Sequence, residues 1–271
     1  YEVTIPFAVA VAHVAGDSQV RTLGGRGHAR QGGLEVLERI LPPGRARRVA
    51  DEARELLAAP MCPEQTCDVV LAPDQMILQI HESIGHPLEL DRILGDERNY
   101  AGTSFVTLDM FGTYRYGSEL LDVTFDPDVH GQVASYAFDD DGTPAKRQWL
   151  IRKGILERGL GGAASQARSG VPGVANARAC AWNRPPIDRM ANLNLEPGTS
   201  SFDELVGAVE DGVYMETNCS WSIDDARNKF QFGCEMGRRI RDGKLAELVR
   251  KPNYRGISAT FWRNLAGVGD A

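Results

Sequence analysis

The sequence predicts an α+β fold, in which an antiparallel, partly barrel-like β-sheet domain is preceded by an α/β segment that carries an HExxxH sequence on a helix. Two observations lead to this class. Up to residue 86, apolar residues recur at the spacing of amphipathic helices. Beyond residue 86, short runs rich in Val, Thr, Tyr and Phe lie between turn signals such as Asp-Pro and Asp-Gly, which is typical of antiparallel strands.

The length of 271 residues allows one large domain or two small ones. We expect residues 1–66 to form the end of an N-terminal α/β region and residues 67–271 to form a second, α+β domain. The chain opens on Tyr1 and closes without a helical pattern. We therefore expect a fragment of a longer protein.

The first elements follow from apolar periodicity and from turn residues. We expect residues 2–13 to form a strand and residues 16–33 to form a long, polar, Gly-rich loop. Residues 34–41 predict a short helix that Pro42 ends, and residues 45–58 predict a longer helix. The apolar face of this longer helix consists of Val49, Ala53, Leu56 and Leu57.

A short apolar strand is expected at residues 68–71, and Asp74 is expected to cap a helix that runs from residue 75 toward residue 86. The Gly-rich residues 159–173 predict an irregular loop. Residues 201–210 predict a helix that begins with a capping box. Further strands are expected at residues 190–195, 213–217, 230–236 and 245–249.

The charge balance argues against nucleic-acid and membrane partners. Thirty Lys and Arg residues against 37 Asp and Glu residues give a net charge of −7, so no overall basic field attracts phosphate backbones or anionic lipids. The longest apolar stretch, residues 5–14, is interrupted by His13 and is far shorter than the roughly 20 residues of a membrane-spanning helix. Five cysteines without a CxxC pair favour a reduced, cytoplasmic protein.

The most informative residues are His81, Glu82 and His86, which form the HExxxH sequence. Two imidazoles can bind a divalent metal, and the carboxylate beside the first can act as a base toward a metal-bound water. Because zinc lowers the pKa of a bound water to about 7, a neighbouring glutamate can take its proton and deliver hydroxide to a polarised carbonyl. This set of residues is typical of a metallohydrolase.

The five-residue spacing of the histidines needs a distorted helix. On a regular helix, residues five apart point about 140° away from each other, since each residue turns the helix by about 100°. Gly85 precedes His86 and Pro87 follows it, and proline disfavours a continuing helix. A π-type turn would bring His81 and His86 to one side. We therefore predict that the helix is distorted or ends between Ser83 and Pro87.

Structural explanations compete with the functional ones. A lone histidine on an apolar helix is more often a core residue than a ligand, and a zinc site also needs a third protein ligand. Residues 139–141 predict a hairpin turn and not a calcium loop. Cys234 lies in an apolar, strand-like run and is expected to be a core residue. The candidates for the third ligand within the chain are Cys234, Cys219, Cys180, His130, Glu89, Asp91 and Asp96.

The sequence around the histidines resembles the TldD/PmbA family of metallopeptidases. The likeness is strongest at residues 79–89 (QIHESIGHPLE) and continues at residues 102–104 (GTS). It covers most of the chain from residue 68 onward. Further matching segments are residues 140–143 (DDGT), 189–192 (RMAN), 196–198 (EPG) and 224–232.

This resemblance implies Zn²⁺ as the cofactor, with His81 and His86 as ligands and Glu82 as the general base. It implies the TldD branch, which keeps the HExxxH sequence, and a TldE/PmbA-like partner subunit or a homodimer. The third ligand of the family is a cysteine in a Gly-flanked downstream segment. Because no cysteine follows Cys234, we expect this ligand beyond Ala271 and an incomplete site within the chain. The resemblance thus implies that residues 67–271 form a TldD-like catalytic domain whose C-terminal part is missing.

The predicted function is that of a zinc-dependent peptidase. The resemblance implies extended or unfolded peptides as substrates, including leader-peptide trimming or maturation of natural-product peptides. The alternative is a non-catalytic peptide-binding or assembly subunit of a TldD/TldE-like complex, which the missing third ligand favours and the intact Glu82 disfavours. A metallohydrolase or lyase that acts on a small metabolite is a third interpretation.

Overall fold

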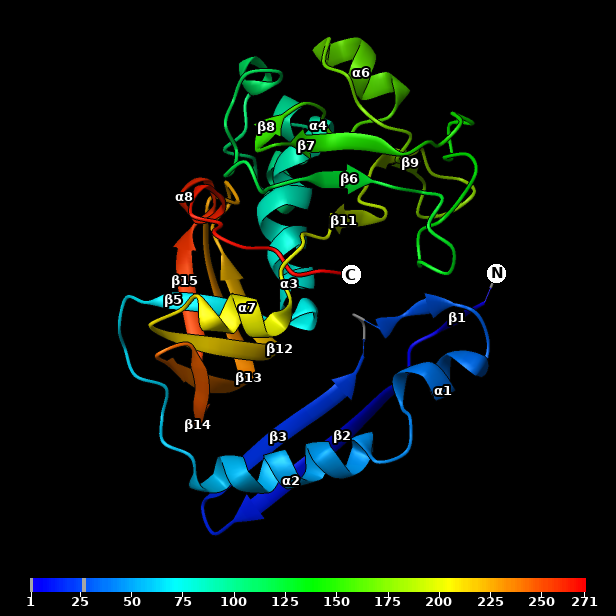
Figure 1. Cartoon of the computed structure of the whole chain (residues 1–271). Coiled ribbons are helices and arrows are strands. Elements are labelled where there is room, and N and C mark those ends of the chain that lie inside the picture. The colour runs from blue at the N-terminus through cyan, green and yellow to red at the C-terminus, as the bar shows by residue number, and fades with distance from the viewer. Residues whose placement is uncertain (1, 26–27) are drawn as a thin grey trace. The chain divides into compact units, whose positions relative to one another are not determined.

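The computed structural model describes residues 2–25 and 28–271, whose elements are labelled in Figure 1. The chain forms two compact units, each assembled from segments that are distant in sequence. The first unit consists of Tyr1–Leu78, Ser200–Trp221 and Gln231–Tyr254, and the second of Gln79–Thr199, Ser222–Phe230 and Arg255–Ala271. Both units combine helices with mainly antiparallel strands, which confirms the α+β class. The boundary expected after residue 66 stays a prediction.

A sheet with the strand order β14–β13–β12–β5 forms the first unit together with a separate hairpin. Strand β5 runs parallel to β12, β13 pairs antiparallel with β14, and β15 also pairs with β13. Helix α2 lies along the hairpin β2–β3 and buries the predicted Val49, Ala53 and Leu56. The strands are β1 (Val3–Thr4), β2 (Phe7–Val14), β3 (Asp17–Gly24), β4 (Arg30–Gln31), β5 (Asp68–Leu71), β12 (Asp211–Ile223), β13 (Lys229–Arg241), β14 (Lys244–Arg250) and β15 (Asn253–Ile257). The helices are α1 (Glu35–Ile40), α2 (Arg45–Ala58) and α7 (Phe202–Gly207).

An antiparallel sheet with the order β11–β6–β7–β8 forms the second unit together with several short helices. The strands are β6 (Val123–Phe125), β7 (Gln148–Arg152), β8 (Ile155–Leu156), β9 (Ala177–Arg178), β10 (Ile187–Asp188) and β11 (Leu193–Leu195). The helices are α4 (Leu90–Leu94), α5 (Arg98–Ala101), α6 (Ala163–Ser169) and α8 (Ser258–Arg263), and α3 (Pro73–Ile80) leads into this unit. Within the described ranges, no helix has the length and apolarity that crossing a bilayer requires.

The core of the second unit surrounds the segment that follows α3. Ile84, Leu88 and Leu90 are fully buried, although they lie between or beside the polar residues of the HExxxH sequence. Their fully buried apolar neighbours in the same unit include Tyr116, Leu121, Val123, Phe125, Leu150, Ile151, Leu156, Leu160 and Trp262. The metal-binding candidates are therefore held by a packed core and not by a mobile surface loop.

The prediction of a loop at residues 16–33 is wrong for residues 17–24 and 30–31. Asp17–Gly24 forms β3, which pairs with β2 along its whole length, and Arg30–Gln31 forms β4, which pairs with β1. The inward-facing residues of β3 include the polar Gln19 and Arg21, so the hydrophobic alternation typical of a strand is absent. Arg21 is only 1% exposed, and carboxylates compensate its charge. These carboxylates belong to Glu52, Glu216 and Glu235. Residues 26 and 27 of the expected loop lie outside the described residues.

The irregular loop expected at residues 159–173 contains helix α6. Gly162 precedes this helix, and Gly170, with φ +70°, ends it. The other glycines allow close packing: a Cβ atom at Gly159 or Gly161 would lie 2.4 Å from a methyl group of Leu90. A glycine-rich composition therefore marks tight packing here as well as a turn.

Several other expectations differ from the structure in extent. The strand expected at residues 190–195 is limited to β11, and the strand expected at residues 2–13 is divided into β1 and β2. Helix α7 has the predicted capping box of Ser201 and Glu204. Asp74 lies inside α3 and not at its cap, and its carboxylate accepts hydrogen bonds from the backbone N–H and the hydroxyl of Thr217.

Candidate metal centre

A π-helical turn brings the two histidines of the HExxxH sequence to one side. Helix α3 passes into a π-helix at His81–Gly85, which is followed by a 3₁₀ turn at His86–Leu88. The backbone N–H of His86 donates to the carbonyl of His81, five residues earlier, instead of to the residue four earlier. The predicted distortion between Ser83 and Pro87 is confirmed, and it extends back to His81.

Pro87 explains why the regular helix ends at this point. In an α-helix, the carbonyl of Ser83 would accept a hydrogen bond from the N–H of residue 87, and proline has no N–H. The hydroxyl of the fully buried Tyr116 donates to the Ser83 carbonyl in its place. The buried carbonyl is thus satisfied without a helical partner.

The Ser83 side chain fixes the same turn from the other side. Its hydroxyl donates to the carbonyl of Gln79 over 2.6 Å and accepts from the side-chain amide of Gln79 over 2.8 Å. It also accepts from the indole N–H of Trp262 over 2.9 Å. One donor and two acceptor positions are therefore all used, which is the full capacity of a hydroxyl.

Gly85 is needed because a neighbouring segment approaches the turn closely. A Cβ atom at this position would lie 2.0 Å from the sulfur of Met190 and 3.1 Å from a methyl group of Leu193. Both distances are shorter than ordinary van der Waals contacts. The turn that carries the histidines therefore packs directly against the segment that leads into β11.

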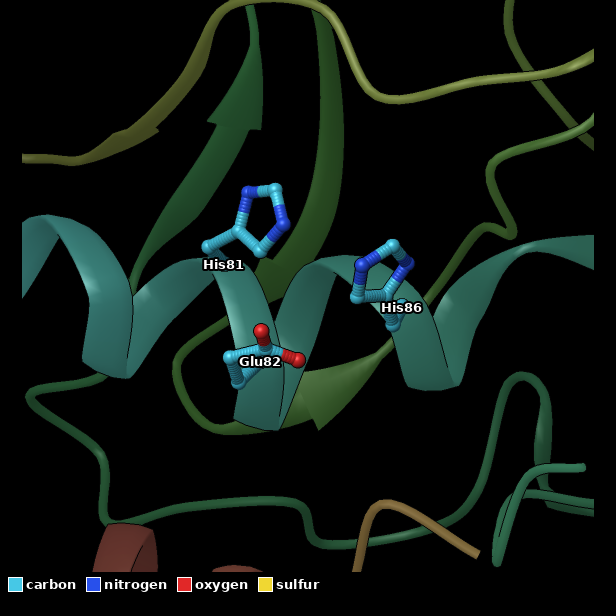
Figure 2. Close-up of side chains that lie close together, drawn as sticks. All are labelled: His81, Glu82 and His86. Atoms are coloured by element: carbon cyan, nitrogen blue, oxygen red, sulfur yellow. The ribbon is translucent and has the colours of Figure 1, made fainter. Parts of the chain in front are cut away.

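The side chains of His81, Glu82 and His86 converge. The two imidazole rings are 4.6 Å apart at their centroids and nearly perpendicular, with an interplanar angle of 85°. Figure 2 shows both rings on the same side of the helix, with Glu82 beside them. One donor atom from each of the three residues lies within 4.8 Å of the others, so this cluster could hold a metal ion.

Glu89 orients the ring of His86. Its Oε2 atom lies 2.8 Å from Nδ1 of His86 and accepts from Nη2 of Arg92 over 3.0 Å. Burial raises the pKa of Glu89, but its hydrogen bond with His86 and the positive charge of Arg92 outweigh burial and hold this pKa below its ordinary value. An ionised Glu89 accepts the Nδ1 proton of His86, which leaves Nε2 of His86 to bind a cation.

His81 is uncharged at neutral pH. Burial and the neighbouring His86 lower the pKa of His81 from 6.5 to about 4. A neutral imidazole carries the lone pair that a metal ion needs, so no proton competes for His81 near pH 7. The donor chemistry of the cluster therefore fits a divalent metal that prefers nitrogen ligands.

The Glu82 carboxylate is only 6% exposed and is paired with Arg227. Nη1 of Arg227 donates to Oε2 of Glu82 over 2.8 Å, although the two residues are 145 positions apart in sequence. Sequence analysis missed Arg227, as well as the contacts of Tyr116 and Trp262 with Ser83. Only Pro87 gave a signal, because a missing N–H in a buried helix implies that another donor satisfies the carbonyl four residues earlier.

The structure gives each candidate for the third ligand a different environment. Cys234 is buried, in agreement with its expected place in the core, whereas Cys180, Cys219 and His130 are exposed. Glu89 contacts His86, Asp91 contacts Asp188, and Asp96 pairs with Arg168. Across residues 2–25 and 28–271, His81, Glu82 and His86 are the one group of at least three such side chains with donor atoms this close together.

Comparison with known proteins identifies the family of this chain. The model of the PmbA/TldA metallopeptidase C-terminal domain matches residues 64–271. A metalloprotease from Methanothermobacter thermautotrophicus is 32% identical over 256 residues, which are 94% of this chain and 54% of that protein. A zinc metalloprotease TldD homolog from Saccharolobus solfataricus is 28% identical over 189 residues, which are 69% of this chain and 40% of that protein.

Solved structures share the fold at low sequence identity. A Thermotoga maritima protein described as a modulator of DNA gyrase superposes with a TM-score of 0.75 at 19% identity, covering 97% of this chain and 56% of that one. TldE from Thermococcus kodakarensis superposes with a TM-score of 0.70 at 14% identity, covering 96% and 55%. The chain spans about half the length of the curated relatives it matches. Because the family match extends over most of its residues, the chain belongs to the TldD/PmbA family of metallopeptidases.

Proposed function

We propose that this chain supplies the catalytic residues of a zinc-dependent peptidase of the TldD branch. In this proposal His81 and His86 bind Zn²⁺, and Glu82 is the general base. The observation that carries the proposal is the π-turn, because it brings two imidazoles five positions apart to one side of the helix, next to a carboxylate. A regular helix would separate the two rings.

The donor set supports zinc as the metal. Neutral imidazoles are among the preferred ligands of zinc, and a carboxylate that holds the second nitrogen of a ligating histidine, as Glu89 does for His86, is common at zinc sites. When bound, Zn²⁺ supplies a Lewis acid next to Glu82. The third ligand in the proposal is a cysteine beyond Ala271.

Glu82 moves the protons in the proposed reaction. Its carboxylate takes a proton from the water that attacks the scissile carbonyl and returns this proton to the leaving amine. The low exposure of Glu82 strengthens its electrostatic interactions with reacting groups, because little bulk water screens them. Arg227 occupies only Oε2, and among the described residues no side chain hydrogen-bonds to Oε1 of Glu82.

The proposed substrates are extended or unfolded peptides, including leader segments of peptide natural products. The proposed assembly is a complex with a TldE/PmbA-like subunit or a homodimer, located in the cytoplasm. The names of the relatives as metalloproteases support peptide-bond hydrolysis, and the similarity of the fold to TldE supports an assembly of related subunits. Cell fractionation and size-exclusion chromatography of the full-length protein test the location and the assembly.

The test combines zinc content with peptide cleavage in the full-length protein. We expect Glu82→Gln to retain zinc and to lose cleavage of an unstructured peptide library, whereas His81→Ala and His86→Ala lose both. Retained cleavage in Glu82→Gln would remove this residue from the mechanism. A wild-type protein that binds zinc and peptide without cleavage would support the non-catalytic assembly subunit, and turnover of small metabolites alone would support the third interpretation.

A further inference from the structure

Arg227 reaches Glu82 from a tightly built turn in the second unit. Its backbone has φ +61°, which is unfavourable for a residue other than glycine. The turn is held by hydrogen bonds on both sides of Arg227: its N–H donates to the carbonyl of Asp224 over 3.0 Å, and its carbonyl accepts from the hydroxyl of Ser258 over 3.0 Å. Surrounding contacts must maintain this strained conformation, and such conformations cluster at functional sites.

The segment that follows helix α5 forms hydrogen bonds with this turn. The N–H of Thr103 donates to the carbonyl of Asp225, and the N–H of Phe105 donates to the carbonyl of Ala226, each over 2.8 Å. Gly102, which precedes Thr103, has φ +78°, and a Cβ atom there would lie 2.6 Å from the carbonyl oxygen of Asp225. The backbones of the two segments are therefore in direct contact, which fixes the position of the Arg227 backbone.

The carbonyl of Ala101 connects the contacts of Glu82 with those of His86. It accepts from Nη2 of Arg227 over 3.2 Å and also from Nη1 of Arg92. Arg92 donates in turn to Glu89, which holds the ring of His86. A continuous set of hydrogen bonds thus runs from His86 through Glu89, Arg92, the Ala101 carbonyl and Arg227 to Glu82.

We infer that Arg227 is a positioning residue for the reaction proposed above: it holds Oε2 of Glu82 so that Oε1 is presented to the attacking water. This inference rests on the proposed function. A glutamate side chain has three rotatable bonds, and a guanidinium that contacts both the carboxylate and a fixed carbonyl restricts them. Small errors in the position of a catalytic group are costly, since a misplacement of about 1 Å can lower a rate by about 100-fold.

A positioning role differs measurably from a purely structural ion pair. If Arg227 positions Glu82, its loss lowers kcat while substrate binding and zinc content are retained. If the pair only stabilises the fold, its loss lowers the melting temperature or the zinc content and leaves kcat per zinc-loaded molecule unchanged. The proper readout is therefore the split between kcat and KM, measured together with zinc per chain.

The experiment compares Arg227→Met and Arg227→Lys with Arg168→Met in the full-length, zinc-loaded protein. Arg168 provides the matched control because it forms an ion pair with Asp96 in the same unit, on an exposed surface and outside the site. We expect Arg227→Met to lower kcat by about 10- to 100-fold, with KM changed by less than about two-fold and zinc content unchanged. Arg227→Lys should recover part of the rate, since one ammonium can reach the carboxylate but lacks the planar fork that also contacts Ala101.

Three results would overturn the inference. They are an unchanged kcat in Arg227→Met, an equal loss in Arg168→Met, and a loss of activity that follows the loss of zinc. If Arg227→Met does not fold, an unchanged kcat in Arg227→Lys overturns the inference, and a reduced kcat with zinc retained supports it.

The double variant Glu82→Gln/Arg227→Met gives an independent check. The two residues act as one unit, so the residual rate of the double variant, measured at high enzyme concentration, should be no lower than the residual rate of Glu82→Gln alone. A further loss of the full size seen in Arg227→Met would contradict it. A wild-type protein without peptidase activity would refute the proposed function instead, so the two failures are distinguishable.

Discussion

At the scale of single residues, the geometry of the metal centre depends on how Ser83 is held. Its carbonyl lies where a helix would continue, and Pro87 removes the helical donor, so Tyr116 provides the hydrogen bond. Its hydroxyl joins Gln79 and Trp262. These contacts are all buried, and a buried carbonyl without a partner destabilises the fold by about 1–3 kcal/mol. Ser83 therefore has a structural role: its hydrogen bonds fix the turn that carries Glu82 and His86.

The first prediction concerns Tyr116→Phe, which removes only the hydroxyl. We expect the free energy of unfolding to fall by about 1–3 kcal/mol, because the Ser83 carbonyl loses its donor. Urea unfolding followed by tryptophan fluorescence measures this change, since Trp262 hydrogen-bonds to the same serine. The control is Tyr114→Phe, which removes a hydroxyl of a less buried tyrosine in the same segment. Equal effects of the two variants would contradict the role of Tyr116.

The sequence predicted some site residues and missed others for a simple reason. His81, Glu82 and His86 lie within six consecutive residues, so their chemistry is visible in one short stretch. Arg227 lies 145 positions from Glu82, and without the fold nothing in the sequence connects the two. The π-turn could be predicted because its cause, the pair Gly85 and Pro87, is local. The donor that replaces the missing N–H could not, because it comes from a distant segment.

At the scale of elements, the π-helix His81–Gly85 competes with a regular helix. The distinction is which carbonyl accepts from the backbone N–H of His86: the present structure uses that of His81, five residues earlier, while the Ser83 carbonyl accepts from Tyr116. In a regular helix the N–H of His86 would donate to the carbonyl of Glu82 and a backbone N–H at position 87 would donate to that of Ser83, which would turn the His86 ring away from His81. The positions of the metal ligands therefore depend on which of these two hydrogen-bond patterns forms.

The second prediction follows from restoring that backbone donor with Pro87→Ala. We expect zinc affinity to fall by about 10- to 100-fold, a range typical of lost ligand orientation. The free energy of unfolding should change by less than about 1 kcal/mol, because a regained backbone hydrogen bond offsets the greater chain entropy of the unfolded alanine variant. Chelator competition measures the affinity. Pro172→Ala, an exposed proline in the same unit, is the control and should leave zinc binding unchanged. Unchanged zinc affinity in Pro87→Ala would show that the proline does not determine the turn.

Helix α4 and strand β10 are joined by two buried carboxylates, Asp91 and Asp188. Each accepts a hydrogen bond from the backbone N–H of the other, and Asp188 also accepts from the N–H of Gly162. Burial and the neighbouring carboxylate raise the pKa of Asp91 to about 7, and burial raises the pKa of Asp188. The pair therefore favours a protonated form in the folded protein.

The third prediction is the pH dependence that results from this pair. A folded pKa raised above the unfolded value of about 3.9 means that the folded state binds the extra proton, so the stabilisation is complete below pH 4 and is lost as the pH rises through about 7. We expect the free energy of unfolding to fall between pH 5 and pH 8. Urea unfolding across this range measures the slope, which Asp91→Asn should flatten. An unchanged slope in Asp91→Asn would contradict the assignment.

The elements differ in how well the sequence predicted them. Helix α2 and strand β5 have the predicted bounds, and α7 has the predicted capping box, because each depends on local periodicity or capping. The hairpin β2–β3 was missed on its second strand, since the inward-facing Arg21 is buried by carboxylates that other segments supply. Because distant residues compensate the charge of Arg21, the sequence of β3 itself lacks the hydrophobic alternation that would predict a strand.

At the scale of the whole molecule, the cluster of His81, Glu82 and His86 and all its described contacts lie in the second unit. The family match covers this entire unit and about half of the first, and the chain spans about half the length of the matched relatives. A zinc site with two histidines needs a further protein ligand, for which we propose a cysteine beyond Ala271. The proposal is therefore best tested on the full-length protein.

The central claim is that His81 and His86 bind one metal ion together. Zinc X-ray absorption spectroscopy of the full-length protein reports the atoms bound to the metal. We expect a first shell with two imidazole nitrogens at about 2.0–2.1 Å and one sulfur at about 2.3 Å in the wild-type protein, and the loss of this bound zinc in His86→Ala. A zinc shell without imidazole, or a spectrum that is unchanged in His86→Ala, would contradict this claim.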